Sequence, residues 1–195
     1  MPAMDDHYNR VAVVLHWAIG LALLAQIILG LSMIEIPKNP VGVRAFWFNL
    51  HKSTGITIGL LVFARIAWRL ANGAPNLPAN LPLWQRRAAR ASHVLLYVCM
   101  AALPLTGYFG SSFSNYPIKY FGVPLPQWGW DAPALKTAFS AIHLGLVCVF
   151  IVLIAVHGAA ALRHLRARDG VFGRMWPGRF GAAASLQSSG SSPAS

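Results

Sequence analysis

Four long runs of apolar residues alternate with short polar segments along this chain. The runs cover about residues 11–34, 46–70, 91–109 and 137–162, and polar side chains interrupt each of them only rarely. A helix of about 20 apolar residues is long enough to cross the hydrocarbon core of a bilayer. Each run is therefore predicted to be a membrane-spanning helix, and the chain to fold as an all-α, four-helix transmembrane bundle.

The segments between and after these runs complete the predicted organisation. Residues 72–90 read as a proline-rich connector that ends in the basic cluster Arg86, Arg87 and Arg90, and residues 110–136 as a longer connector rich in aromatic side chains. Such aromatics favour the membrane interface. Residues 1–180 are predicted to form one membrane domain, and the Gly/Ala/Ser-rich residues 181–195 a disordered tail.

Composition and charge support a membrane protein. The chain is 56% hydrophobic and only 11% charged, which is too little polar surface for an ordinary soluble domain. Its net charge of +11 comes from Lys and Arg residues that lie mostly at the ends of the apolar runs, and no nucleic-acid-binding module accompanies them. Membrane lipid is therefore the expected partner of this charge, and nucleic acid is not.

The basic residues also predict an orientation. Four spans place both chain ends on one side of the membrane, and eleven Lys and Arg residues fall on that side against five on the other. Positively charged residues are enriched on the cytoplasmic side, so both termini are expected in the cytoplasm.

The two cysteines imply no disulfide framework. Cys99 and Cys148 each fall in the middle of an apolar run, where we expect small buried residues. The sequence has no Cys-x-x-Cys-His motif, so a haem would be held by coordination and packing and not by thioether links.

Histidines inside the apolar runs point to chemistry. His143 and His157 are fourteen residues apart, nearly four helical turns, so both face one way and lie ~21 Å apart along the axis. On the predicted topology His16 shares the cytoplasmic layer with His157, and His51 shares the opposite layer with His143. Ionisable side chains in membrane helices usually mark a functional site. Paired imidazoles from different helices suit an iron porphyrin with both axial positions filled.

The fourteen-residue step recurs on other runs. His16 is followed at this step by Gly30, which offers no side chain and leaves room for a macrocycle. His51 is followed by Arg65, whose guanidinium is placed to pair with a porphyrin propionate. The alternatives are that Arg65 is an ordinary snorkelling anchor and that Gly30 only packs against a neighbouring helix.

Three further positions carry weaker indications. His93 precedes Gly107 by the same step. Three roles are open for His93: an axial ligand, a contact of a propionate or quinone, or a hydrogen-bonding partner of a neighbouring helix. Gly55 is a small position beside His51, suited to a cofactor or to close helix packing. His164, at the edge of the last run, is expected to be solvated.

Together these residues resemble the bacterial cytochrome b561 family of small four-helix di-haem proteins of the inner membrane. The resemblance covers about residues 8–178 and implies two haem b groups, the cytoplasmic one held by His16 and His157 and the periplasmic one by His51 and His143. It rests on Leu15-His16-Trp17, Leu50-His51-Lys52, Leu103-Pro104-Leu105-Thr106-Gly107, Ile142-His143 and Val156-His157-Gly158-Ala159-Ala160.

The resemblance implies transmembrane electron transfer between a periplasmic donor and the membrane quinone pool. Some relatives are similar to a superoxide oxidase, which takes an electron from superoxide and reduces quinone. The periplasmic side has five basic residues against Glu35 and Asp131, and this positive balance would attract a small anion. Lys52, next to the predicted ligand His51, is the first candidate for attracting superoxide. The alternative electron donor is a periplasmic redox protein.

Two other functions are alternatives to this one. As the cytochrome b anchor subunit of a hydrogenase or dehydrogenase complex, the chain would use the connector at residues 110–136 as a docking surface. A divalent-metal transporter would need its ligands grouped in one site near the middle of the membrane, and the ~21 Å between His143 and His157 argues against it.

Overall fold

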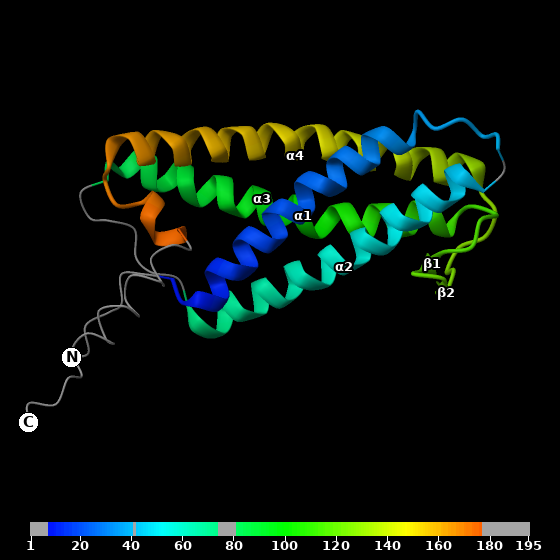
Figure 1. The fold of residues 1–195 in the computed structure, drawn as a ribbon, viewed down its shortest axis with the longest axis horizontal. Coiled ribbons are helices and arrows are strands. Elements are labelled where there is room, and N and C mark those ends of the chain that lie inside the picture. Colours follow the sequence, from blue (N-terminus) through cyan, green and yellow to red (C-terminus); the bar gives the residue numbers. More distant parts are fainter. Residues whose placement is uncertain (1–7, 41, 74–80, 177–195) are drawn as a thin grey trace, which may run out of the picture.

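Four long helices make up most of the chain (Figure 1). The computed structural model describes residues 8–40, 42–73 and 81–176, so the predicted tail at residues 181–195 lies outside the described part. The helices are α1 (Arg10–Met33), α2 (Val43–Asn72), α3 (Leu83–Ser112) and α4 (Pro133–Ala167). Strands β1 (Lys119–Tyr120) and β2 (Val123–Pro124) form a short antiparallel hairpin before α4, and the 3-10 helix η1 (Phe172–Met175) follows it.

The helices run along the long axis of the bundle in an up-and-down order (Figure 1). The most extensive contacts join α3 to α4 and α1 to α2, and α2 also packs on α3. We call the end where α1 begins and α4 ends the terminal end, and the opposite end, which carries the β1–β2 hairpin, the hairpin end. Helix η1 lies at the terminal end.

Local signals explain where the helices begin and end. The Asn9 side chain caps α1 by accepting a hydrogen bond from the backbone N–H of Ala12 at 2.9 Å. Gly42 before α2 and Gly73 after it have φ angles of 99° and 70°, which favour glycine. Proline at residue 133 fits the first turn of α4, where its missing N–H breaks no helical hydrogen bond.

The third helix begins earlier than its apolar run. Arg86, Arg87 and Arg90, predicted in a connector, lie in the first turns of α3, which starts directly after Pro82. The sequence there is rich in Ala and Arg, which are good helix formers. Helices α2 and α4 likewise extend past their predicted spans at both ends. Apolar runs mark the part of a helix suited to hydrocarbon, whereas the helix itself continues into the polar boundary.

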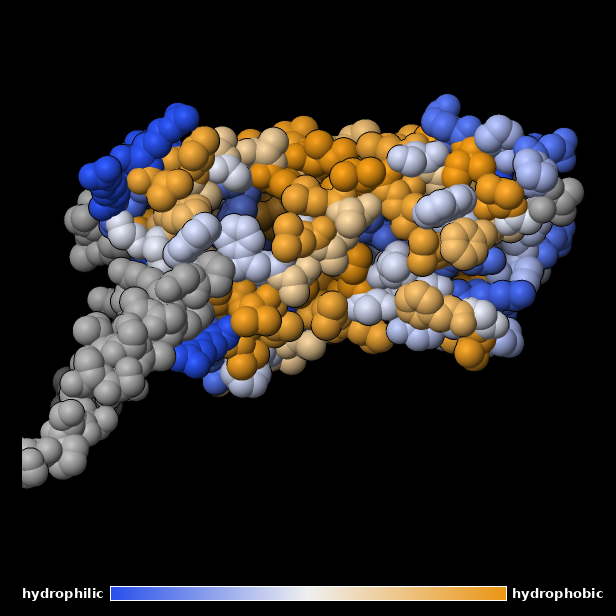
Figure 2. Space-filling view, viewed as in Figure 1, coloured by the Kyte–Doolittle hydropathy of each residue, from blue (hydrophilic) through white to orange (hydrophobic). Residues whose placement is uncertain are grey.

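The bundle buries few side chains in its interior and has a wide apolar surface. All four helices are long and apolar enough to cross a membrane. On the face shown in Figure 2, apolar residues cover most of the middle of the bundle and hydrophilic residues gather at its two ends. Six of the buried apolar residues form two small clusters, Ile19, Ile58 and Val62 between α1 and α2, and Leu96, Cys99 and Phe150 between α3 and α4. The fold is that of a four-helix, multi-pass membrane protein.

The two cysteines differ in burial. Cys99 is buried between α3 and α4, as expected, but Cys148 is exposed on α4, so the prediction for Cys148 was wrong. In a membrane bundle an apolar position is as suited to lipid as to the protein interior. The centre of an apolar run therefore does not indicate which side of the helix faces its neighbours.

Candidate functional site

Two imidazoles meet at the hairpin end. His51 of α2 and His143 of α4 have their ring centres 6.4 Å apart with the ring planes at 82°. We call them the hairpin-end pair. Both rings lie against glycines: a Cβ added to Gly30 would be 2.9 Å from His51 Cε1, and one added to Gly107 would be 3.4 Å from His143 Cε1. Glycine at position 30 is therefore what lets the His51 ring lie against α1.

The two rings of this pair differ in their polar partners. The Thr106 hydroxyl lies 3.1 Å from His143 Nδ1, which fixes one nitrogen of that ring. Nδ1 of His51 is buried and has no hydrogen-bond partner among the described residues. Buried polar atoms are nearly always paired, so an unpaired ring nitrogen indicates a position suited to a ligand.

Three imidazoles gather at the terminal end. His16 of α1 and His157 of α4, which we call the terminal-end pair, have ring centres 6.1 Å apart with the planes at 69°. His93 of α3 also lies beside His157, with its ring centre 5.4 Å away. His93 Nδ1 donates to the Ala89 carbonyl at 2.8 Å, since a carbonyl can only accept, and its Nε2 then keeps a free lone pair.

A buried positive charge lies beside the terminal-end pair. Arg65 of α2 is only 8% exposed; its Nη1 donates to the Ala12 carbonyl at 2.7 Å and its Nη2 lies 3.4 Å from His16 Nδ1. Within residues 8–40, 42–73 and 81–176 no carboxylate pairs with it. A buried charge without a counter-charge is destabilising. The position of Arg65 therefore suits an anionic group such as a carboxylate of a bound cofactor.

The spacing of both pairs fits a haem. A metal–imidazole bond is about 2 Å long, so imidazoles on opposite sides of one metal ion have ring centres about 6 Å apart. Both pairs have this separation. In the described part of the chain no group of three or more His, Cys, Asp or Glu side chains is placed to hold a metal ion. A metal whose remaining ligands come from a macrocycle suits such two-histidine sets.

Two glycines that follow His51 on α2 meet protein neighbours. A Cβ at Gly55 would lie 3.0 Å from the Gln26 side-chain nitrogen, and one at Gly59 would lie 3.2 Å from a ring carbon of Pro104. Gly59 therefore permits close packing of α2 on α3. Gly55 makes room for Gln26.

His164 was expected to be solvated, but in the structure it is half-buried and has a partner. Its Nδ1 lies 2.5 Å from Asp169 Oδ2, and the two side chains are 19% and 23% exposed. The chain reverses at Arg168, which has a φ of 52°, and this brings Asp169 back to His164. Burial pushes the pKa of Asp169 upward, but hydrogen bonds from His164 and from the Val171 N–H outweigh it, so this pKa lies below its ordinary value.

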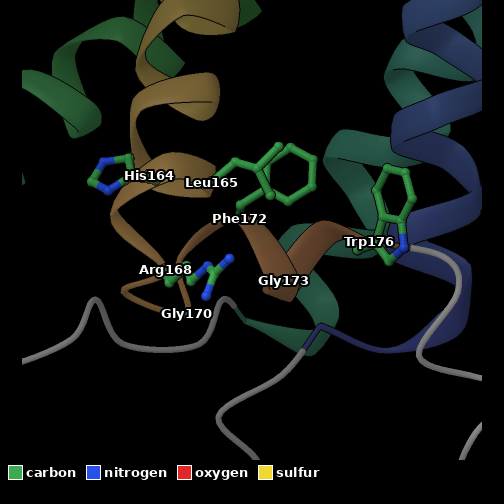
Figure 3. Close-up of a pocket in the computed structure, with 7 residues that line it drawn as sticks. All are labelled: His164, Leu165, Arg168, Gly170, Phe172, Gly173 and Trp176. Carbon is green, nitrogen blue, oxygen red and sulfur yellow. The ribbon is translucent and has the colours of Figure 1, made fainter.

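A pocket of about 410 Å³ lies at the terminal end beside the contact of His164 with Asp169. Figure 3 shows the His164 ring on one side of the last turn of α4, and Phe172 and Trp176 on the other. The indole N–H of Trp17, next to His16, donates to the Met175 carbonyl at 2.6 Å, which ties η1 to α1. The pocket is lined by His164, Leu165, Arg168, Gly170, Phe172, Gly173 and Trp176.

Sequence reasoning missed several of these side chains. Gln26 and Thr106 are polar residues inside apolar runs, and the sequence analysis gives neither of them a role. A polar residue inside an apolar run is the signal that could have found them, since such groups need partners from neighbouring helices. The pairing of His164 with Asp169 had no comparable signal.

Facing imidazoles on four membrane-spanning helices are typical of a membrane-bound cytochrome b. Residues 7–178 match the family model described as prokaryotic cytochrome b561, and the chain belongs to this family. It is 31% identical to cytochrome b561 homolog 2 of Escherichia coli (strain K12) over 165 residues, which cover 82% of this chain and 85% of that protein.

Two further relatives are matched over almost their whole length. Cytochrome b561 homolog 1 of Escherichia coli (strain K12) is 27% identical over 177 residues, 89% of this chain and 99% of that protein. The probable superoxide oxidase CybB of Yersinia pestis is 26% identical over 185 residues, 91% of this chain and 100% of that protein. Membership of the family confirms the resemblance seen in the sequence, and with it a role in transmembrane electron transfer with b-type haem.

Proposed function

We propose that this chain carries electrons across the bacterial inner membrane through two haem b groups, one at each imidazole pair. The observation that carries the proposal is the placement of the pairs: each has ring centres about 6 Å apart, and His143 and His157 place them ~21 Å apart along α4. A haem held by two histidines would supply one-electron chemistry and would leave no position on its iron for a reactant.

The surrounding residues hold and orient the ligands. Arg65 would neutralise a propionate at the terminal-end pair, because its guanidinium is buried without a carboxylate partner among the described residues. Thr106 would fix the ring of His143 through Nδ1. Gly30 leaves the space into which the His51 ring fits.

We place the terminal end in the cytoplasm. Arg86, Arg87 and Arg90, in the first turns of α3, lie at that end together with the basic residues that follow α4. The excess of positive charge at this end supports cytoplasmic termini by the positive-inside rule.

The electron donor would then approach the hairpin end. Lys52 follows His51, and Lys136 of α4 is close enough to Lys52 for their charges to interact. The Ser53 hydroxyl donates to the Lys119 carbonyl at 3.2 Å, which holds strand β1 beside the same turn of α2. No ion pair involves these lysines in the part of the chain that the structure describes. Clustered positive charge of this kind favours a small anionic donor such as superoxide, or a negatively charged redox protein.

Quinone would exchange electrons at the terminal end. The pocket at η1 is lined by the aromatic residues Phe172 and Trp176 and by the polar residues His164 and Arg168. His164 lies seven residues after His157, about two turns, so it is on the same face of α4 and about 10 Å further along. Apolar pockets with a few polar groups are typical small-molecule sites.

Haem content tests the ligands. Purified wild-type protein should contain two haems per chain, and His51→Ala and His157→Ala should each contain one. His164→Ala is the matched control, because it removes a histidine of α4 that belongs to neither pair, and it should keep both haems. Retention of two haems in either ligand variant would contradict the assignment.

Electron transfer is tested with the isolated protein in lipid vesicles. We expect quinone reduction when superoxide is generated outside vesicles in which the hairpin end faces outward. Lys52→Gln should slow this reaction, and added salt should slow the wild type, since screening weakens attraction between charges. Absence of quinone reduction with any donor by protein that holds both haems would contradict the proposal.

One observation favours a second function, the anchor subunit of a larger complex. Tyr116, Trp128 and Trp130 in the connector at the hairpin end are 70%, 71% and 69% exposed. Exposed aromatics are enriched at protein interfaces as well as at membrane boundaries. Co-purification of an iron–sulfur or flavin protein that is lost on changing these three residues would support this role, and quinone reduction by the isolated chain would oppose it.

A further inference from the structure

Gln26 is a polar residue inside the most uniformly apolar part of α1. A side-chain amide in such a place is costly unless both its donor and its acceptor are paired. Gln26 pairs both with α2: its Nε2 donates to the His51 carbonyl at 2.7 Å, and its Oε1 accepts from the Thr54 hydroxyl at 2.7 Å. Both bonds fall on the single helical turn that begins at His51.

The shape of α2 is adapted to this contact. A Cβ at Gly55 would lie 3.0 Å from Gln26 Nε2, so a larger residue at position 55 would push the amide away from α2. The Thr54 hydroxyl also lies 2.8 Å from the Leu50 carbonyl, which keeps its side chain in place beside the amide. We call Gln26, Thr54 and Gly55 the Gln26 clamp.

His51 needs such a clamp more than its partner does. The ring of His143 is oriented directly, by the Thr106 hydroxyl at Nδ1. Nδ1 of His51 has no partner within the described residues, and its ring lies against the bare backbone at Gly30. The direction of the His51 ring is therefore set by the position of its own backbone, which the Gln26 amide holds.

We propose that Gln26 is a positioning residue for His51, and that the Gln26 clamp sets the plane of the His51 imidazole at the hairpin-end haem. The proposal rests on the proposed function, in which His51 is a haem ligand. Groups that orient a metal ligand typically change metal affinity by 10- to 100-fold when they are removed. In this site the orienting group acts on the ligand's backbone instead of its ring.

Two variants test the clamp in the haem-loaded, full-length protein. Gln26→Leu removes the amide at similar size, and Gly55→Ala leaves the amide present but displaces it. Electron paramagnetic resonance of the oxidised protein reports the angle between the two axial imidazole planes, and transfer to apomyoglobin reports haem release. We expect both variants to change the signal of the hairpin-end haem and to speed its release about ten- to hundredfold, with the terminal-end haem unchanged.

Matched controls separate positioning from general damage. Gly145→Ala adds the same methyl group to α4, two residues after His143, where no atom lies within 4 Å of the new Cβ. Ser32→Ala removes an exposed polar side chain from α1. Both controls should match the wild type. The double variant of Gln26→Leu and Gly55→Ala should be no worse than either single one, because both disable one interaction.

The outcomes are distinct. Wild-type signals and release rates in both single variants would overturn the role of Gln26. Equal changes at both haems would also overturn it, since they would indicate a loss of general stability. If the wild type itself gives no signal of a haem with two axial histidines at the hairpin end, the proposed function fails instead.

Discussion

Replacing Gly30 by alanine should weaken haem binding at the hairpin-end pair without unfolding the bundle. The new Cβ would lie 2.9 Å from His51 Cε1, 3.4 Å from its Nδ1 and 3.8 Å from its Nε2. Carbon atoms in contact prefer about 3.5–4.0 Å, so the ring would have to retreat by about 0.6 Å or more. An imidazole free of metal can swing away at little cost, whereas one that binds iron cannot.

The size of the effect follows from this displacement. Ligand distances in a metal site tolerate about 0.2 Å, which is less than the shift that the methyl group demands. Overpacking of a well-packed position costs about 1–3 kcal/mol, which corresponds to roughly a 5- to 150-fold loss of affinity. We expect Gly30→Ala to raise the rate of haem release at the hairpin-end pair by a factor within this range. The terminal-end haem should be retained.

The measurement is haem transfer to apomyoglobin, followed separately for the two haems. Gly20→Ala is the control on the same helix, because a Cβ at Gly20 meets no atom within 4 Å. Thermal unfolding of the haem-free protein should be nearly the same for both variants. Wild-type haem release in Gly30→Ala would refute the argument that His51 is held between iron and the backbone of α1.

Three further changes should act elsewhere. Arg65→Met should leave the haem-free protein at least as stable, because it removes a buried unpaired charge, yet lower haem affinity at the terminal-end pair about tenfold or more; thermal unfolding and haem release measure the two effects. His16→Ala should lose the terminal-end haem while His93→Ala keeps it, as pyridine haemochrome spectra would show; the reverse result would make His93 the ligand. Because the pKa of Asp169 is lowered in the folded protein, its bond with His164 should hold η1 at neutral pH and be lost as the pH falls below about 4. Amide hydrogen exchange in η1, compared at each pH with the intrinsic rate of an unfolded chain, should then show a lower protection factor, and Asp169→Asn should show this lower protection already at pH 7.

Both the helices and the two histidine layers could be predicted from the sequence. A helix has a fixed rise, so the position of a residue along an apolar run gives its depth in the membrane. An up-and-down order of four spans then places His16 at the depth of His157, and His51 at the depth of His143. The structure brings both pairs together. Their coordination of haem stays a prediction.

The contacts between helices were not accessible in the same way. Depth does not give the rotation of a helix about its axis, and in a bundle surrounded by lipid an apolar pattern gives little guidance, as the exposed Cys148 illustrates. Gly55 was therefore assigned to a cofactor or to packing, with no indication that it faces Gln26. The contact of His164 with Asp169 depends on a reversal of the chain at Arg168, which no apolar period encodes.

The two pairs are built by different physical means, and this difference links the predictions. Glycines at positions 30 and 107 shape the hairpin-end pair by contact with its rings, whereas a buried guanidinium and a third imidazole surround the terminal-end pair. A steric change at Gly30 should therefore affect one haem, and removal of the charge at Arg65 the other. If both changes release the same haem, the assignment of these residues to separate layers is wrong, whatever the total haem content.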